Sequence, residues 1–179
     1  HEEFVSAMNA RKYPLYFYWG PFGHANNDAK ILAVNDLVHS FDWLNVRKNE
    51  LYPVFTDAST NDPLPWPGRP DDKKPGQVNA FFRWKPLADR RRRVEVSLFL
   101  LTPQTRKTAF ALPSEATASV TLRRLQRFAV MPGTEVLWSF GARKGTVRAD
   151  SEGLVTVPGL TITGEPQTLR LSKPGWRLW

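Results

Sequence analysis

The residue whose surroundings best suit chemistry is His24, in the segment 19–28, WGPFGHANND. The small neighbours Gly23 and Ala25 leave the imidazole accessible, and the glycine, proline and asparagine around it predict a loop. A neutral imidazole can take up a proton and return it within one reaction cycle, which is the work of a general base. The segment therefore predicts a catalytic histidine. A loop histidine without a chemical role is the alternative interpretation.

The elements around this loop follow one another in a definite order. Residues 2–11 predict a short helix, because acidic residues stand at its start and apolar residues fall on one face. Residues 13–19, YPLYFYW, form a nearly continuous apolar run that is typical of a strand buried on both faces. Residues 29–46 carry apolar side chains near helical spacing and predict a second helix. This order places His24 after the carboxyl end of a buried strand, where α/β enzymes hold their working groups.

The order of helix, buried strand, W-x-x-x-GH and helix resembles the last segment of an α/β-hydrolase of the serine esterase and prolyl-peptidase kind. The resemblance covers residues 1–46, about a quarter of the chain. It implies that His24 is the triad base, which takes the proton of a serine nucleophile and returns it to the leaving group. The reaction that it implies is hydrolysis of an ester or peptide bond.

Two parts of that catalytic machinery are missing from the sequence. No G-x-S-x-G motif occurs, so the chain has no nucleophile elbow. The only carboxylates before His24 belong to Glu2 and Glu3, and neither follows a predicted strand. Because the residues of a triad act as a unit, we expect the chain alone to be inactive. The nucleophile would come from an upstream catalytic part of the same protein or from a separate catalytic chain.

Residues 51–179 differ in character from residues 1–50. The first fifty residues carry five Lys/Arg and six Asp/Glu, a net charge of −1, whereas the rest carry a net charge of +9. Short apolar segments between turn residues predict an antiparallel, Ig-like β-sandwich, preceded by a short α-β-α remnant of an α/β-hydrolase sheet. The segments are 51–59, 77–85, 93–101, 116–121, 135–140, 145–149, 154–157, 160–163 and 168–171. We expect two domains: 1–50, the terminal hydrolase segment, and 51–179, a β-sandwich accessory domain.

The second domain is similar in overall pattern to the β-sandwich appended to some bacterial α/β-hydrolases, in the segments 77–85, 116–140 and 145–162. This similarity carries no catalytic residue. The composition of residues 150–153, DSEG, predicts a hairpin turn. We expect most of the aromatic side chains of the strands to lie in the core: Trp84, Phe99, Phe128, Trp138 and Phe140.

Seven tryptophans raise a second function, because flat indole rings can stack on sugar rings. Trp66, in the proline-rich loop PLPWPGRP, is the best candidate for a ligand-binding residue, and Trp176 and Trp179 are others. In this alternative the chain is a non-catalytic carbohydrate- or protein-binding β-sandwich module. Packing in the core or at a domain interface is the competing interpretation for each ring.

The net charge of +8 and the pI of about 10.0 raise a nucleic-acid-binding role. Arginine gathers at residues 90–93 and again within 123–127. Residues 90–93 stand directly before a predicted strand, however, and no nucleic-acid-binding signature accompanies them. A solvated turn is therefore the favoured interpretation, and a nucleic-acid partner is not expected.

Composition excludes several other classes of site. A chain without cysteine has no disulfide, thiolate metal site or cysteine nucleophile. Three histidines and scattered carboxylates lack the spacing of a metal site, so neither a metal nor a cofactor is expected. No run approaches the ~20 apolar residues of a membrane-spanning helix. The sequence does not identify the compartment, and a secreted or periplasmic location stays open.

The predicted strand 13–19 also bears on oligomeric state. Without its parent sheet, this strand would present unpaired main-chain groups along its edges. We therefore expect it to pair with a second copy of the chain, which gives a homo-oligomer, or with a separate catalytic chain.

Overall fold

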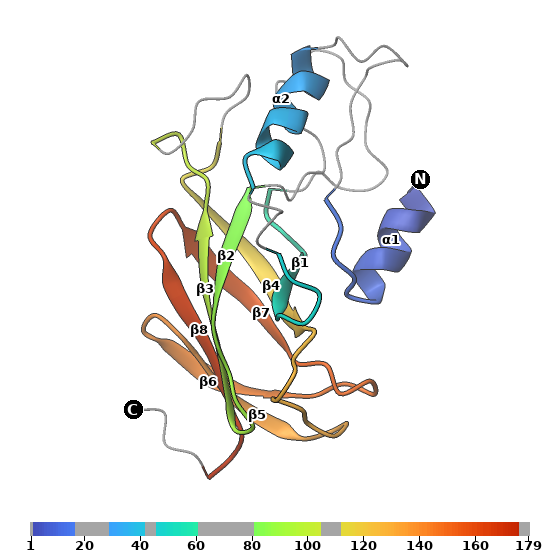
Figure 1. Cartoon of the computed structure of the whole chain (residues 1–179), viewed down its shortest axis with the longest axis vertical. Helices are drawn as coiled ribbons and strands as arrows, with labels where there is room; N and C mark the ends of the chain where they lie inside the picture. The colour runs from blue at the N-terminus through green and yellow to red at the C-terminus, as the bar shows by residue number, and fades with distance from the viewer. Residues whose placement is uncertain (1, 17–28, 42–45, 61–80, 105–111, 176–179) are drawn as a thin grey trace.

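Two antiparallel β-sheets packed face to face form the body of the protein (Figure 1). The computed structural model describes residues 2–16, 29–41, 46–60, 81–104 and 112–175. One sheet has the order β1-β4-β7, with strands β1 (Tyr52–Thr56), β4 (Glu115–Arg123) and β7 (Thr156–Thr163). The other has the order β2-β3-β8-β5-β6, with β2 (Phe82–Asp89), β3 (Arg93–Leu100), β8 (Gln167–Ser172), β5 (Glu135–Phe140) and β6 (Arg143–Arg148). The predicted antiparallel β-sandwich is confirmed.

The core lies between the two sheets and follows the two-residue period of the strands. Alternate side chains of β3 are buried, beginning with Val94, while those between them reach the outer face of the sheet. The two sheets meet at the rings of Phe55 and Phe82, which stack with their centroids 4.4 Å apart. Of the aromatic side chains predicted for the core, Phe128, Trp138 and Phe140 are buried there. The other two, Trp84 and Phe99, are only partly buried.

Two helices precede the sandwich, as the sequence predicts. Helix α1 (Glu2–Ala10) ends in a Schellman motif, in which Tyr13 N donates to Met8 O and Lys12 N donates to Asn9 O. Lys12 occupies the left-handed position of this motif with a φ of 54°. Beyond it, residues 13–16 form no strand, and the rest of the predicted strand 13–19 lies outside the described residues. The α-β-α remnant of a hydrolase sheet is therefore not confirmed.

Helix α2 (Ala29–His39) lies at one end of the sandwich (Figure 1). The sequence predicts a helix over 29–46, but the helix ends seven residues earlier. At this end of the helix, Ser40 Oγ donates to Leu37 O and Phe41 N donates to Val38 O, so the last turn closes on itself. The side chain of Leu37 is fully buried and belongs to the sandwich core, so α2 packs on the sheets directly.

In the second half of the chain, one predicted turn is replaced by a bulge and one predicted hairpin is a crossover. Residues 156–157 and 160–163 belong to one strand, β7, because Pro158 and Gly159 form a bulge opposite Ser119 instead of a turn, whereas residues 154 and 155 precede the strand. Residues 150–153 do form a turn, in which Gly153 N donates to Asp150 O. This turn joins β6 to β7, which lie in different sheets, so it is a crossover and not a hairpin.

Candidate functional site

The two residues that the sequence singles out for function, His24 and Trp66, lie outside the described residues. The same holds for Trp176 and Trp179. The nearest described element to His24 is helix α2, which begins five residues later at Ala29. The candidate site is therefore built from the described residues that hold α2 against the sandwich.

A buried arginine, Arg83, holds the carboxyl end of α2. Its side chain is only 5% exposed, although it stands on the outward-facing register of the edge strand β2. The guanidinium donates to Leu37 O at 2.9 Å, to Ser40 Oγ at 2.8 Å and to Phe82 O at 2.9 Å. A cation at this position also suits the negative end of the helix dipole. Arg83 thus ties the helix that follows the His24 loop to the first strand of the larger sheet.

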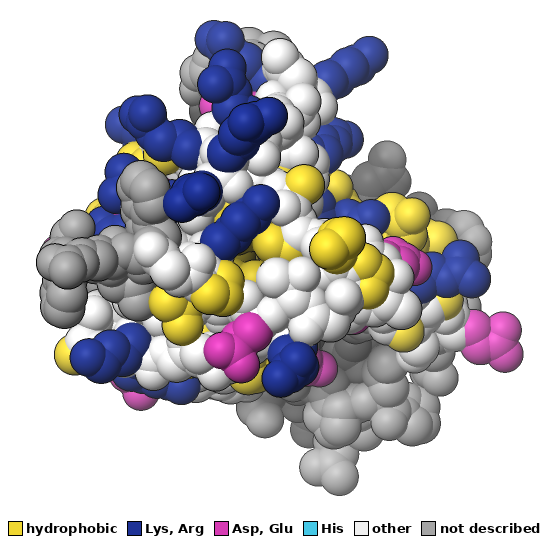
Figure 2. Space-filling model, turned by 90° about the horizontal axis from the view of Figure 1, so that it is seen from below, with side chains coloured by type: hydrophobic (Ala, Val, Ile, Leu, Met, Phe, Trp, Pro, Cys, Tyr) yellow, Lys and Arg dark blue, Asp and Glu magenta, His cyan; other side chains and the backbone are white. Residues whose placement is uncertain are grey.

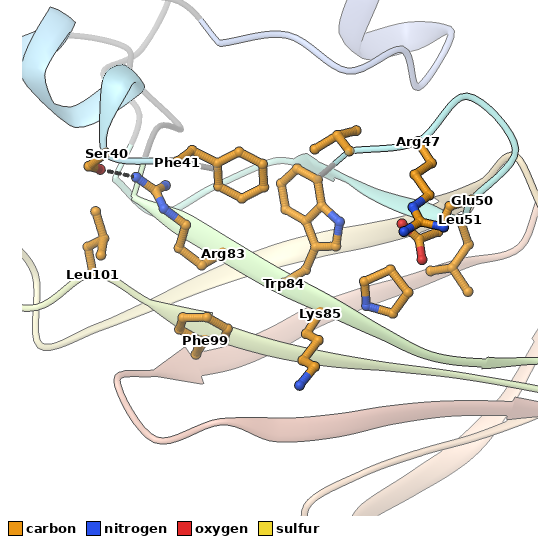
Figure 3. A pocket seen from close by; sticks show the side chains of 12 residues that line it. Ser40, Phe41, Arg47, Glu50, Leu51, Arg83, Trp84, Lys85, Phe99 and Leu101 are labelled. Atoms are coloured by element: carbon orange, nitrogen blue, oxygen red, sulfur yellow. Dashed lines mark hydrogen bonds between the residues drawn. The ribbon is translucent and has the colours of Figure 1, made fainter. Parts of the chain in front are cut away.

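Aromatic rings surround this joint and line a hollow of about 380 Å³. The guanidinium of Arg83 lies 5.3 Å from the centroid of the Phe41 ring, and the Phe41 and Trp84 rings lie 4.5 Å apart. Figure 3 shows these rings together with Phe99, which lies across from Arg83 on β3. The charged side chains that line the hollow are those of Arg47, Glu50, Arg83 and Lys85. Rings and charges of both signs suit a ligand with an apolar face and polar edges.

A second hollow, of about 310 Å³, is also lined by Trp84. Its lining combines Leu15 and Tyr16, from the segment after α1, with Tyr52 and Val54 of β1. Burial raises the pKa of Tyr16 to about 12, and the charge of Arg83 opposes part of that rise. The phenol of Tyr16 is therefore protonated at neutral pH, and it sits close enough to Arg83 to feel its charge.

The segment after α1 is tied to the sandwich by polar contacts of its own. Lys12 Nζ lies 2.7 Å from Asp150 Oδ2, in the crossover turn between β6 and β7. Arg123 donates from β4 to the main-chain carbonyls of Arg11 and Lys12, both at 3.3 Å, and its guanidinium lies over the Tyr13 ring. Both helical segments are thus fixed to the sandwich through charged side chains.

Arginine side chains gather at the other end of β2. Arg90 and Arg93 exchange main-chain hydrogen bonds of 2.8 and 3.3 Å, so residues 90–93 form the predicted turn between β2 and β3. The carboxylate of Asp89 accepts hydrogen bonds from the main-chain N–H groups of Gln126, Arg127 and Phe128. This holds the loop after β4 against the turn.

The part of the chain that the structure describes holds no candidate metal site. No group of three or more His, Asp and Glu side chains among these residues could hold a metal ion. Among the same residues, no helix is long and apolar enough to cross a membrane.

Sequence reasoning missed Arg83 and Asp89. A signal for Arg83 is present, because it is the only cation within the apolar run AFFRW, where a charged side chain needs a partner. Its partners lie on a helix more than forty residues away, so the sequence could not name them. Asp89 has no comparable signal, because a carboxylate directly before a run of arginines is typical of a solvated turn.

Comparison of the sequence with protein-family models, with curated proteins and with solved structures gave no match.

Proposed function

We propose that this chain is the C-terminal part of a serine α/β-hydrolase, with a β-sandwich accessory domain fixed to the segment that carries the triad histidine, His24. The nucleophile and the acid come from the catalytic part upstream in the same protein or from a separate catalytic chain. The proposal is supported by the order of α1, the W-x-x-x-GH loop and α2. The observation that carries it is the hold of buried Arg83 on the carboxyl end of α2.

This hold matters because a catalytic base must be placed accurately. A misplacement of about 1 Å can cost roughly 100-fold in rate. The planar guanidinium of Arg83 fixes Leu37 and Ser40 with two directed hydrogen bonds, and the fully buried side chain of Leu37 prevents α2 from sliding. An accessory domain that clamps the helix after the histidine loop would stabilise the loop from its downstream side.

In the proposed reaction, a ring nitrogen of His24 takes the proton of the serine hydroxyl as the serine oxygen attacks the carbonyl carbon of the substrate. The same proton then passes to the leaving alcohol or amine, and an acyl-enzyme remains. Water attacks the acyl-enzyme with His24 again as the base, which releases the acid and restores the serine. No cofactor takes part in these steps.

The test joins this chain to the catalytic segment encoded before it and measures hydrolysis of p-nitrophenyl acetate. We expect His24→Ala to lower kcat at least about 10³-fold, because removal of one triad member disables the unit. His39→Ala is the matched control, because His39 is exposed in the last turn of α2 and should leave kcat unchanged. Full activity in His24→Ala, or an upstream segment without a serine nucleophile, would contradict the proposal.

A binding function is favoured by a separate observation, the hollow lined by Phe41, Trp84 and Phe99. A saturable change in tryptophan fluorescence on addition of soluble glycans, lost in Trp84→Leu, would support a carbohydrate-binding module. Loss of the change in Trp66→Leu alone would assign binding to the proline-rich loop. A fluorescence that no glycan alters would contradict this second candidate.

A further inference from the structure

The end of the sandwich farthest from α2 carries a concentration of arginine, which we call the basic end: Arg90, Arg91, Arg92 and Arg127. The strand β2 connects the two ends of the sandwich, with Arg83 near its start and Asp89 at its finish. Six steps of ~3.3 Å separate Arg83 from Asp89 by about 20 Å. Figure 2, seen from below, shows Lys and Arg side chains crowded over part of this face. The basic end thus lies at the other end of β2 from Arg83.

The arginines of the basic end surround a hollow. Arg90, Arg91, Gln126 and Arg127 line a concavity of about 480 Å³. Asp89 creates this arrangement, because its carboxylate accepts from the main-chain N–H of Arg127 at 3.1 Å and of Phe128 at 2.8 Å. The carboxylate of Asp89 is thus hydrogen-bonded to main-chain N–H groups. Among the described residues, no carboxylate forms an ion pair with Arg90, Arg91 or Arg127.

Exposed aliphatic side chains accompany these charges. Leu87 is 49% exposed and lines a smaller hollow together with Asp89 and Arg127. Met131 is 78% exposed and lies four residues after Arg127, in the turn that leads into β5. The pairing of β3 with β8 and of β8 with β5 places the start of β5 at the same end as the β2–β3 turn. The basic end therefore combines the guanidinium groups of Arg90, Arg91 and Arg127 with protruding apolar side chains.

We propose that the basic end docks on an anionic lipid surface. Guanidinium groups pair with phosphate through two parallel hydrogen bonds, and the arginine-lined hollow can admit one headgroup phosphate. Every cation near the surface of an anionic membrane adds to the attraction, and apolar side chains beside the cations can enter the interfacial layer. Leu87 and Met131 are placed to do so.

Polyanions that bind through stacking fit this surface less well. Single-stranded nucleic acids and sugars use exposed aromatic rings as platforms. Phe128, the aromatic residue next to Arg127, is 1% exposed beside Lys173. The apolar side chains that do protrude are aliphatic. This combination favours lipid over a stacked polymer.

The experiment measures co-sedimentation of the whole chain with vesicles of phosphatidylcholine alone and of equal parts phosphatidylcholine and phosphatidylglycerol. We expect binding to the mixed vesicles only, with loss in high salt because the Debye length falls from about 10 Å to about 3 Å at molar ionic strength. The double variant Arg91→Glu/Arg127→Glu should bind at least about 25-fold more weakly, at about fivefold for each neutralised arginine. Met131→Ser should lose roughly threefold or more.

The matched control is Lys144→Glu, which reverses an exposed charge near the β5–β6 turn, at the other end of β6 from Arg148. It should bind the mixed vesicles as the unmodified chain does. Equal binding to both kinds of vesicle, or no binding to either, would overturn the proposal. Tighter binding to heparin or single-stranded DNA at the same salt, lost in the same double variant but not in Met131→Ser, would assign the surface to a soluble polyanion instead.

Discussion

At each end of strand β2, a charged side chain forms hydrogen bonds with another segment of the chain, and the two charges are opposite. Near its start, Arg83 donates to Leu37 O and Ser40 Oγ and so binds the carboxyl end of α2. At its end, Asp89 accepts hydrogen bonds from the main-chain N–H groups of residues 126–128 and so binds the loop after β4. In both places one charged side chain satisfies main-chain groups that a regular sheet or helix would leave unpaired.

The two ends differ in how deeply the charged side chain is buried and in how easily water can replace its hydrogen bonds. Arg83 is 5% exposed and its bonds to Leu37 O and Phe82 O are buried with it, so water cannot easily substitute for them. Asp89 is partly exposed, and the N–H groups that donate to it belong to a surface loop. A charged hydrogen-bonding group should therefore matter more at the α2 end than at the basic end. The predictions below test this ranking.

The largest effect is expected from Arg83→Met, which keeps an unbranched side chain but removes the guanidinium. The carbonyl of Leu37 loses its donor within a buried region, so the free energy of unfolding should fall by about 3 kcal/mol. Urea denaturation followed by tryptophan fluorescence measures this fall. Limited proteolysis should also show faster cleavage within residues 29–41, because α2 loses its attachment.

Arg83→Lys separates charge from geometry at the same position. Lysine keeps the positive charge but cannot form the planar set of hydrogen bonds, so it should recover only part of the loss. Full stability in the lysine variant would show that charge alone holds α2. Unchanged proteolysis in Arg83→Met would show that Leu37 packing suffices without the arginine.

A smaller loss, about 2 kcal/mol, is expected for Asp89→Ala, because three main-chain N–H groups lose a charged acceptor but gain access to water. Hydrogen exchange of the amides of residues 126–128 should accelerate markedly, while α2 stays protected. Asp89→Asn keeps one acceptor oxygen, so its free energy of unfolding should lie between those of Asp89→Ala and the unmodified chain. A loss that exceeds that of Arg83→Met would reverse the ranking of the two ends.

The two ends also differ in how far the sequence predicted them. The β-sandwich follows from alternating apolar residues, and β5 (Glu135–Phe140) lies where that alternation places it. The turn at residues 90–93 was also predicted, because charged residues interrupt two apolar runs. These features are local, so a pattern of neighbouring residues contains them.

The predictions that failed depend on contacts distant in the sequence. Helix α2 ends at His39 instead of residue 46, where Arg83 takes the carbonyl of Leu37. The Pro158-Gly159 pair has the composition of a turn, but pairing with β4 makes it a bulge. Of the candidate site, the sequence suggested His24 from a motif. It could not show that a distant arginine holds the helix after it.

Tyr16 offers a pH-dependent measure of the α2 end. Burial raises its pKa to about 12, against the opposing charge of Arg83, so its folded-state pKa lies above the unfolded value of 10.0. The neutral phenol stabilises the fold, and this contribution is complete below pH 10 and is lost as the pH rises from 10 towards 12. The loss should be about 2 kcal/mol, since the hydroxyl oxygen is buried and a rise of two pKa units sets the scale.

Ultraviolet absorbance of the phenolate, taken as the difference between the unmodified chain and Tyr16→Phe, follows this titration. In Arg83→Met the pKa of Tyr16 should rise further, because the cation that opposes the rise is gone. Ionisation of Tyr16 below pH 10 would contradict the buried position of the phenol beside Arg83.

The smallest effect is expected where the segment after α1 meets the sandwich, at the ion pair of Lys12 and Asp150. Burial raises the pKa of Asp150, but hydrogen bonds from Lys12 and from the N–H groups of Leu154 and Glu152, with the charge of Lys12, outweigh it and leave the pKa below 3.8. The stability that this carboxylate contributes is present above pH 3.8 and is lost as the pH falls through its folded-state pKa. Both side chains are partly exposed, so Lys12→Met should cost less than about 1 kcal/mol, and less still in high salt.

Lys12→Gly distinguishes this ion pair from the strain of the backbone beneath it. Lys12 has a φ of 54°, in the left-handed region that costs an L-residue about 1 kcal/mol and costs glycine almost nothing. Both variants lose the ion pair, but only glycine relieves the strain of the Schellman motif. Thermal unfolding at neutral pH should therefore place Lys12→Gly at or above the unmodified chain and Lys12→Met slightly below it. If both variants were equally destabilised by several kcal/mol, the exposed pair would rival Arg83, and burial would not be what separates a strong charged joint from a weak one.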